Sequence, residues 1–168
     1  GAHRGCGTRQ PRPMTQAAPG WVASALGPGD LRIERIETIA LRAPLARRFV
    51  GSAYSMDNRC TIVVRMTTED GGVSGTYSGD TDEEQSLILD IIHRELAPAL
   101  LGRSARDPEG AWRSMEPSTN NILRERGFAL QAIAAMDTSI WDLLGRAVGL
   151  PLHRMWGATT DDLPISVI

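Results

Sequence analysis

Two adjacent arginines, Arg47 and Arg48, are the residues of this chain best suited to bind a small anion. A guanidinium group presents a planar fork of N–H donors that matches a carboxylate in a bidentate arrangement. The rings of Phe49 and Tyr54 could exclude water from a bound ligand, and Tyr77 could offer a second contact. We therefore predict that these five residues bind a carboxylate substrate. The alternatives are a solvated loop whose rings pack on their own domain and, for Tyr77, an ordinary strand residue.

Several other chemistries are excluded or disfavoured by composition. All 18 basic residues are arginine, so this chain contains no lysine for a Schiff base, a P-loop or a general base. His3, His93 and His153 are far apart and have no carboxylates at metal-ligand spacing. We therefore predict no catalytic residue and no metal site in the chain. Cys6 and Cys60 cannot build a disulfide framework, and we interpret both as free thiols in a reducing compartment.

Asp137 is the most unusual acid because it falls on the apolar face of a predicted helix. Residues three and four positions apart share a helix face. The other members of this face are Leu130, Ile133, Ala134, Trp141, Leu144 and Val148. A carboxylate there costs free energy unless it is hydrogen-bonded or paired. We favour a structural role, as a buried acid bonded to the backbone or an arginine, over a catalytic or metal-binding role. Asp142 and Arg146, four residues apart, are expected to form a pair in water.

The elements that must position these residues begin with three predicted strands. Apolar and β-branched residues favour strands over residues 31–42, about 59–68 and 73–77. Residues 69–72, Glu-Asp-Gly-Gly, are a strong turn signal between the last two strands. The arginine pair lies in residues 43–57, which we predict to be a long loop. The strands are expected to form an antiparallel meander.

Helical signals dominate the second half of the chain. Thr81 is suited to cap a helix that we expect to end at Pro98 and Gly102. Its apolar stripe would comprise Leu87, Ile88, Ile91, Ile92 and Leu96. A short helix is predicted to begin at Asp107-Pro108 and to close at Pro117.

A long helix is predicted over residues 122–148. It could break near Gly127, and Gly149 followed by Pro151 is a typical stop signal. Residues 152–156 are expected to add one further turn.

The two ends of the chain differ from its centre. Residues 1–30 are rich in Gly and Pro with little to bury, and we expect a disordered tail. No apolar run approaches the roughly 18 residues of a membrane span, and no signal peptide is evident, so we expect a cytoplasmic protein. The net charge of −2 comes from 18 basic and 20 acidic residues, so neither a nucleic-acid nor a membrane partner is predicted.

The segment of residues 132–146, followed by Gly149-Leu150-Pro151-Leu152 and Trp156-Gly157, resembles a known N-terminal signature. It is similar to that of the mandelate racemase/muconate-lactonising branch of the enolase superfamily. The signature residues are Asp137, Trp141, Asp142, Gly145, Pro151 and Gly157. The meander, the long loop and the helices before it are also similar to that family's N-terminal capping domain.

The resemblance implies an α+β fold, in which a three-stranded antiparallel meander precedes a helical bundle. The capping domain would occupy residues 31–157. Residues 158–168 would form a linker and the first strand of a (β/α) barrel. A complete barrel needs about 200–250 residues, so we expect the barrel to be missing from this chain.

The resemblance also implies a function for the parent enzyme. In the family, Mg²⁺ held by acidic barrel residues assists abstraction of a proton α to a carboxylate. The parent would then be a racemase, an acid-sugar dehydratase or a cycloisomerase, and a homo-oligomer, acting on a hydroxy acid or sugar acid. This chain would cap the barrel and help to select the substrate, while Mg²⁺ and the catalytic bases lie outside it. The alternative is a non-catalytic interaction or oligomerisation module from a truncated or split protein.

Overall fold

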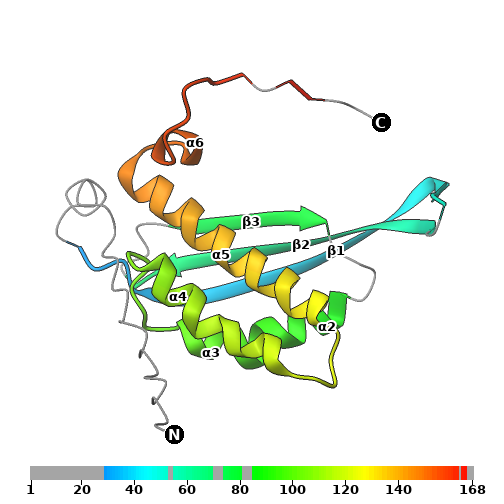
Figure 1. The fold of residues 1–168 in the computed structure, drawn as a ribbon, viewed down its shortest axis with the longest axis horizontal. Coiled ribbons are helices and arrows are strands. Elements are labelled where there is room, and N and C mark those ends of the chain that lie inside the picture. Colours follow the sequence, from blue (N-terminus) through cyan, green and yellow to red (C-terminus); the bar gives the residue numbers. More distant parts are fainter. Residues whose placement is uncertain (1–28, 53–54, 70–73, 81–84, 163, 166–168) are drawn as a thin grey trace, which may run out of the picture.

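A computed structural model describes residues 29–52, 55–69, 74–80, 85–162 and 164–165 of the chain. Three antiparallel strands form one sheet in the order β1-β2-β3. The strands are β1 (Ile33–Val50), β2 (Ser55–Thr68) and β3 (Ser74–Asp80). Helices cover one face of this sheet, and α5 (Arg126–Val148) runs across it (Figure 1). The predicted meander and the α+β class are therefore confirmed.

The prediction of a long loop over residues 43–57 is wrong, because most of this segment is strand. β1 continues to Val50 and β2 already begins at Ser55, which pairs with Val50. Pairing satisfies backbone N–H and C=O groups that a loop would leave to water. Pro44 does not prevent this pairing, because β1 lies at the edge of the sheet and needs no partner on its outer side. The ladder is irregular between Pro44 and Phe49.

Alternation along β2 explains how the sheet builds the core. Cys60, Ile62, Val64 and Met66 are buried, whereas the residues between them are more exposed up to Arg65. Successive side chains of a strand point to opposite faces, so the buried set faces the helices. On the neighbouring strand, Gly75 pairs with Met66 and lies against α5.

The helix predicted after the sheet is confirmed, but it continues past Pro98. It comprises α2 (Gln85–Ile91), the π-helical η1 (Ile92–Leu96) and α3 (Ala97–Leu100). Pro98 lies in the first turn of α3, directly after the π-helical η1, where the regular backbone hydrogen-bond pattern is already interrupted. The chain leaves the helix at Gly102, whose φ of 76° favours glycine. Leu87, predicted on the buried stripe, is exposed, whereas the other four stripe residues are buried. Thr81 lies outside the described residues.

The next two elements follow local signals closely. Helix α4 (Pro108–Met115) begins at Asp107, whose Oδ1 accepts a hydrogen bond of 2.9 Å from the N–H of Gly110. A 3-10 turn, η2 (Glu116–Asn120), contains Pro117 and follows α4 directly. The predicted short helix is therefore confirmed.

The long helix α5 begins at Arg126, four residues later than predicted, and is not broken at Gly127. Its end is a Schellman motif: the N–H of Leu150 bonds to the C=O of Gly145, and that of Gly149 to the C=O of Arg146. Gly149 has the left-handed φ of 69° that this motif requires. The short helix α6 (Leu152–Met155) follows, as predicted.

The buried face of α5 differs from the predicted stripe. Of that stripe only Ile133 and Leu144 are buried, while Leu130 and Ala134 are exposed. The buried residues are Ala129, Ala132, Ile133, Ala135, Met136, Ser139, Ile140, Leu143, Leu144 and Gly145. The helix contacts β3 and β2 as well as α2 and α4, so several neighbours decide which residues are covered.

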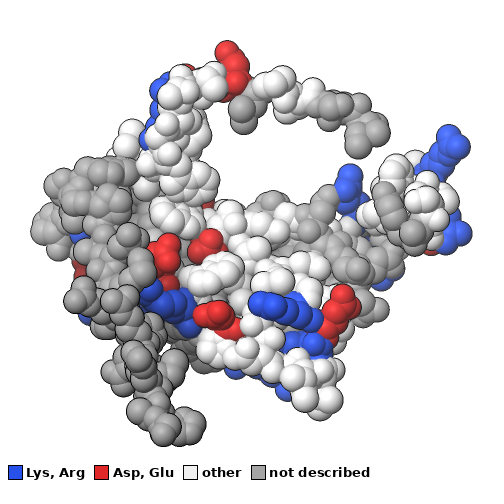
Figure 2. Space-filling model, viewed as in Figure 1, with Lys and Arg blue, Asp and Glu red and all other residues white. Residues whose placement is uncertain are grey.

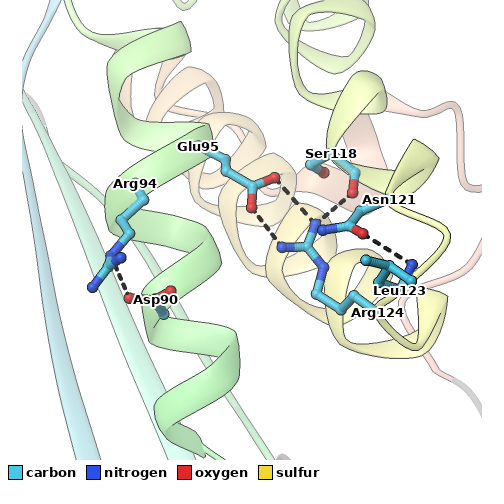
Figure 3. A network of polar contacts seen from close by, with 7 residues as sticks. All are labelled: Asp90, Arg94, Glu95, Ser118, Asn121, Leu123 and Arg124. Atoms are coloured by element: carbon cyan, nitrogen blue, oxygen red, sulfur yellow. Dashed lines mark hydrogen bonds and ion pairs between the residues drawn. The ribbon is translucent and has the colours of Figure 1, made fainter.

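A polar network joins η1 to the segment that precedes α5 (Figure 3). Arg124 binds both carboxylate oxygens of Glu95, at 2.5 and 3.1 Å, and also donates to the C=O of Ser118. The hydrogen bond from Arg124 lowers the pKa of Glu95 below its ordinary value, against a smaller opposing effect of burial. The Asn121 side chain accepts from the N–H of Leu123 at 3.0 Å. These contacts hold the turn that leads into α5.

The described parts of the two chain ends carry no regular structure. At the N-terminal side, the backbone of Leu31 and Ile33 bonds to Ala105 and Arg103, which ties the start of the sheet to the segment before α4. At the C-terminal side, Pro164 and Ile165 are not in a strand, and the rest of residues 163–168 lies outside the described part. The predicted tail of residues 1–30 also lies outside it, apart from Gly29 and Asp30.

Candidate functional site

The predicted arginine pair lies at the far end of the β1–β2 hairpin. β3 pairs with β2 only between Thr61 and Thr67, so the hairpin extends beyond it as a two-stranded arm (Figure 1). Arg47, Arg48 and Phe49 occupy the end of β1 and line a shallow surface hollow of about 370 Å³ together with Val50. We call residues 47–57 the hairpin tip. Basic side chains are visible there in Figure 2.

The two arginines of the tip have different surroundings. Arg48 donates to Ser55 Oγ at 2.8 Å, and its Nε lies 3.2 Å from Asp57 Oδ1, so it braces the two strands. Arg47 is exposed and makes no hydrogen bond or ion pair with another described residue. Phe49, beside it, is 54% exposed. Arg47 is therefore the guanidinium group free to meet a ligand, next to an exposed ring.

Of the other predicted binding residues, Tyr77 is not assembled with this pair. Tyr54 lies outside the described residues. Tyr77 is half-buried against the core and pairs with Val64, eight positions along β2 from Met56, which pairs with Phe49. At about 3.3 Å per residue this separation is about 26 Å. The chain itself therefore does not bring Tyr77 to the hairpin tip.

Asp137 lies half-buried in a second hollow, of about 210 Å³, between α4 and α5. The other residues lining it are Pro108, Glu109, Trp112 and Trp141. Burial, and secondarily the charge of Glu109, raise the pKa of the Asp137 carboxyl above its ordinary value. Asp137 has no hydrogen bond or ion pair with a described residue, so the expected bond to backbone or arginine is not found there.

Asp142, rather than Asp137, makes the hydrogen bonds to a backbone group and an arginine that were expected of Asp137. Its Oδ2 accepts from the backbone N–H of Thr76 at 2.7 Å and from Arg146 Nε at 2.8 Å. The predicted pair with Arg146 is confirmed, but Asp142 is half-buried rather than facing water. No sequence signal reveals the bond to Thr76, because the two residues are 66 positions apart.

The remaining signature residues shape the connection after α5. Gly145 is buried, and an added Cβ there would lie 3.0 Å from the C=O of Leu150. Pro151 caps α6, and Gly157 has a left-handed φ of 82°. Trp141 and Trp156 meet edge to face, with ring centroids 5.5 Å apart. These residues determine the path of the backbone that leaves the domain.

The described residues do not provide a metal centre. No group of three or more His, Cys, Asp or Glu side chains among them is placed to hold an ion. His93 Nε2 lies 2.8 Å from Thr38 Oγ1, and His153 Nε2 lies 2.9 Å from Asp161 Oδ1. The two described histidines therefore have different partners and do not share a site. A Mg²⁺ ion therefore does not fit this part of the chain. None of the described helices is long and apolar enough to cross a membrane.

A family model for the mandelate racemase/muconate lactonizing enzyme N-terminal domain matches residues 35–157. The chain belongs to this family. The match covers the sheet from residue 35 onward, all described helices and every signature residue, so the resemblance drawn from residues 132–157 is confirmed. The hairpin tip also lies within the matched range.

Two curated enzymes illustrate the relationship. The 3,6-anhydro-alpha-L-galactonate cycloisomerase of Streptomyces coelicolor is 30% identical over 134 residues, which are 79% of this chain and 37% of that enzyme. A D-galactonate dehydratase family member from Streptomyces sp. strain SPB074 is 31% identical over 147 residues, which are 88% of this chain and 30% of that protein. The chain thus spans about a third of the length of these relatives.

Solved structures give the same result. A mandelate racemase/muconate lactonizing enzyme structure with 47% identity superposes with a TM-score of 0.77, over 80% of this chain and 36% of its own. A relative from a marine actinobacterium, crystallised in complex with magnesium, is 42% identical with a TM-score of 0.70, over 80% of this chain and 34% of its own. The matched part is the N-terminal domain of longer enzymes.

Proposed function

We propose that this chain is the capping domain of a Mg²⁺-dependent enzyme that abstracts a proton α to a carboxylate. The family match over residues 35–157 carries this proposal. The reaction of the whole enzyme would be a racemisation, a dehydration or a cycloisomerisation. When bound, Mg²⁺ would stabilise the negative charge that develops on the substrate carboxylate. Its ligands and the catalytic bases would belong to a second domain, because the described residues do not fit the ion.

Within this role, the hairpin tip would contact the substrate. Arg47 is exposed and has no partner among the described residues, so its guanidinium group can bind a carboxylate. Arg48, held by Ser55 and Asp57, would keep the arm straight. Phe49 would exclude water from the bound substrate. A hydroxy acid or sugar acid fits this set of groups, whereas Tyr77 would serve packing rather than binding.

The open face of the sheet supports a further part of the proposal, association of the whole enzyme as a homo-oligomer. Ile39 is 56% and Leu41 is 51% exposed on the face opposite to the helices. Neighbouring exposed apolar side chains of this kind are typical of contact surfaces.

A domain exchange tests the proposed function. Residues 35–157 would replace the matching domain of the Streptomyces coelicolor cycloisomerase. Turnover of 3,6-anhydro-alpha-L-galactonate and exchange of α protons with deuterium would then be followed by NMR over a panel of hydroxy and sugar acids. We expect α-proton exchange to persist with a changed order of substrates. Circular dichroism and gel filtration of the chimera establish that it is folded.

Variants of the tip make the test specific. Arg47→Ala should raise KM about 10- to 100-fold, the loss expected for one charged hydrogen-bonding group. Arg94→Ala is the matched control, since Arg94 is an exposed arginine on η1 paired only with Asp90, 2.6 Å away. The interaction-module alternative would be favoured by a folded chimera with an unchanged order of substrates. It would also require that Arg47→Ala and Arg94→Ala have the same KM.

A further inference from the structure

The hollow between α4 and α5 has the composition of a binding site for a positively charged group next to an apolar one. We call it the α4–α5 hollow; its lining is Pro108, Glu109, Trp112, Asp137 and Trp141. Trp112 is 39% exposed although it is a large aromatic residue on a short helix. Acidic side chains are visible over this part of the molecule in Figure 2.

The two carboxylates of the hollow lack cationic partners in the described structure. Glu109 and Asp137 make no ion pair there, and Arg113, one turn along α4 from Glu109, does not pair with it. Burial raises the pKa of Asp137, and the charge of Glu109 adds to the effect. A cation placed in the hollow would relieve both the desolvation and the like-charge repulsion.

Indole rings and carboxylates together favour one class of ligand. A guanidinium group stacks on an indole face and pairs with a carboxylate. Proline rings adjacent to it pack well in grooves lined by aromatic residues, because the extended proline-rich backbone is already ordered. An arginine flanked by prolines therefore matches the α4–α5 hollow.

The chain carries such a segment outside the described residues. Residues 1–28 contain Arg4, Arg9 and Arg12 but no Asp or Glu, and Arg12 stands between Pro11 and Pro13. The matched family domain begins only at residue 35, so this segment lies outside the part that the family shares.

The start of the described chain lies beside the hollow. The Arg106 guanidinium donates to the C=O of Gly29, and Arg106 is two residues before Pro108 in the hollow. Arg12 is 17 residues before Gly29 in the chain. Such a length can span up to about 55 Å at roughly 3.3 Å per residue, so Arg12 can reach the hollow easily.

We propose that the Pro11-Arg12-Pro13 segment binds in the α4–α5 hollow, with the Arg12 guanidinium between Glu109 and Asp137 and the prolines against Trp112 and Trp141. The N-terminal segment would then cover part of the helical face of its own domain. This inference does not depend on the proposed substrate or reaction.

A spin label on Cys6 tests the proposal in the full chain. Cys6 is six residues from Arg12, and the other cysteine, Cys60, is 1% exposed and protected from labelling. We expect the label to abolish most of the indole N–H intensity of Trp112 and Trp141 in a ¹⁵N spectrum, relative to the reduced label. The backbone N–H of Val50, at the hairpin tip, should keep its intensity.

Two sets of variants decide the outcome. Arg12→Ala should restore the indole signals, whereas Arg4→Ala should not. The double variant Glu109→Gln/Asp137→Asn should also restore them, and Asp90→Asn, an exposed acid elsewhere, should not. Arg12 precedes the matched residues 35–157, so its replacement leaves every residue of that domain unchanged. Unchanged indole signals in the labelled protein, or a loss that survives Arg12→Ala, would overturn the proposal.

Discussion

At the scale of single residues, the two aspartates of α5 exchange the roles expected of them. The expected buried acid, Asp137, lines a hollow without a hydrogen bond to any described residue. Asp142 instead accepts the backbone N–H of Thr76, a donor at the outer edge of β3. We therefore expect Asp142, which meets an otherwise unpaired backbone group, to be the acid that stabilises the domain.

We predict that Asp142→Ala lowers the free energy of unfolding by about 1–2 kcal/mol, because it leaves the Thr76 N–H without its acceptor. Asp137→Ala should cost less. Urea unfolding followed by circular dichroism measures both. Asp142→Asn should recover much of the loss, since an amide oxygen can still accept from Thr76. Asp90→Ala, which removes an exposed acid paired with Arg94, provides the control. A larger loss for Asp137→Ala would mean that Asp137, not Asp142, is the acid that stabilises the domain.

At the scale of elements, α5 is held against the sheet by the close approach of two backbones. A Cβ added at Gly75 would lie 1.9 Å from the C=O of Ser139 and 2.6 Å from the Cβ of Leu143. Neither contact can be relieved by rotating a side chain. β3 can therefore dock on α5 only because residue 75 has no side chain.

Gly75→Ala should accordingly destabilise the domain by about 1–3 kcal/mol or more, since α5 must move away from β3. Gly127→Ala is a suitable control. Its Cβ would meet only the flexible Glu125 side chain, at 3.4 Å, and alanine is favoured over glycine in a helix by up to about 1 kcal/mol. Thermal unfolding of both variants distinguishes them. Equal midpoints would mean that α5 does not depend on this approach.

The Glu95–Arg124 contact links η1 to the turn before α5 and predicts a pH dependence. The pKa of Glu95 is lowered in the folded state, chiefly by its hydrogen bond from Arg124. The stabilisation is therefore complete above the ordinary value of 4.5 and is lost as pH falls through the lowered folded pKa. Glu95→Gln should remove this part of the acid-side loss, whereas Glu34→Gln, at an exposed site on β1, should not. Denaturant midpoints measured between pH 3 and pH 7, a window of about four units around the ordinary carboxyl range, would show parallel curves if the contact were unimportant.

At the scale of the whole molecule, the described chain is a sheet covered on one face by helices, with an arm that reaches beyond them (Figure 1). Its acidic and basic side chains are interspersed over the visible face (Figure 2). Two acids, Glu109 and Asp137, lie together at the α4–α5 hollow. They supply fewer oxygen ligands than Mg²⁺ requires.

We therefore predict that this chain has no stoichiometric Mg²⁺ site. Titration calorimetry should give only weak heats, and EDTA should leave the thermal midpoint unchanged. The marine actinobacterium relative, crystallised in complex with magnesium, is the positive control. A saturable site in this chain with micromolar affinity would contradict the prediction.

Much of the candidate site could be predicted from residue types, but its shape could not. The adjacent arginines and the exposed ring of Phe49 are visible in the sequence, and the structure places them together on β1. The bracing of Arg48 by Asp57 depends on the register of the hairpin, which no local signal determines. Tyr77 has a ring and a hydroxyl group suited to binding but lies along the sheet from the tip, because β3 pairs with β2 only up to Thr61.

Local chemistry determined where most elements begin and end. Asp107 starts α4, and Gly149 with Pro151 ends α5, because each acts on backbone groups within a few residues of itself. The family, too, follows from the contiguous signature of residues 132–157. Only the tertiary structure decided that residues 43–57 form an arm, which face of α5 is buried, and that Asp142 rather than Asp137 joins helix to sheet. The burial of α5 and the bond to Asp142 depend on partners tens of residues away, whose positions are set by packing of the whole core. The arm depends instead on the register in which Val50 pairs with Ser55 and Phe49 with Met56, which no local signal determines.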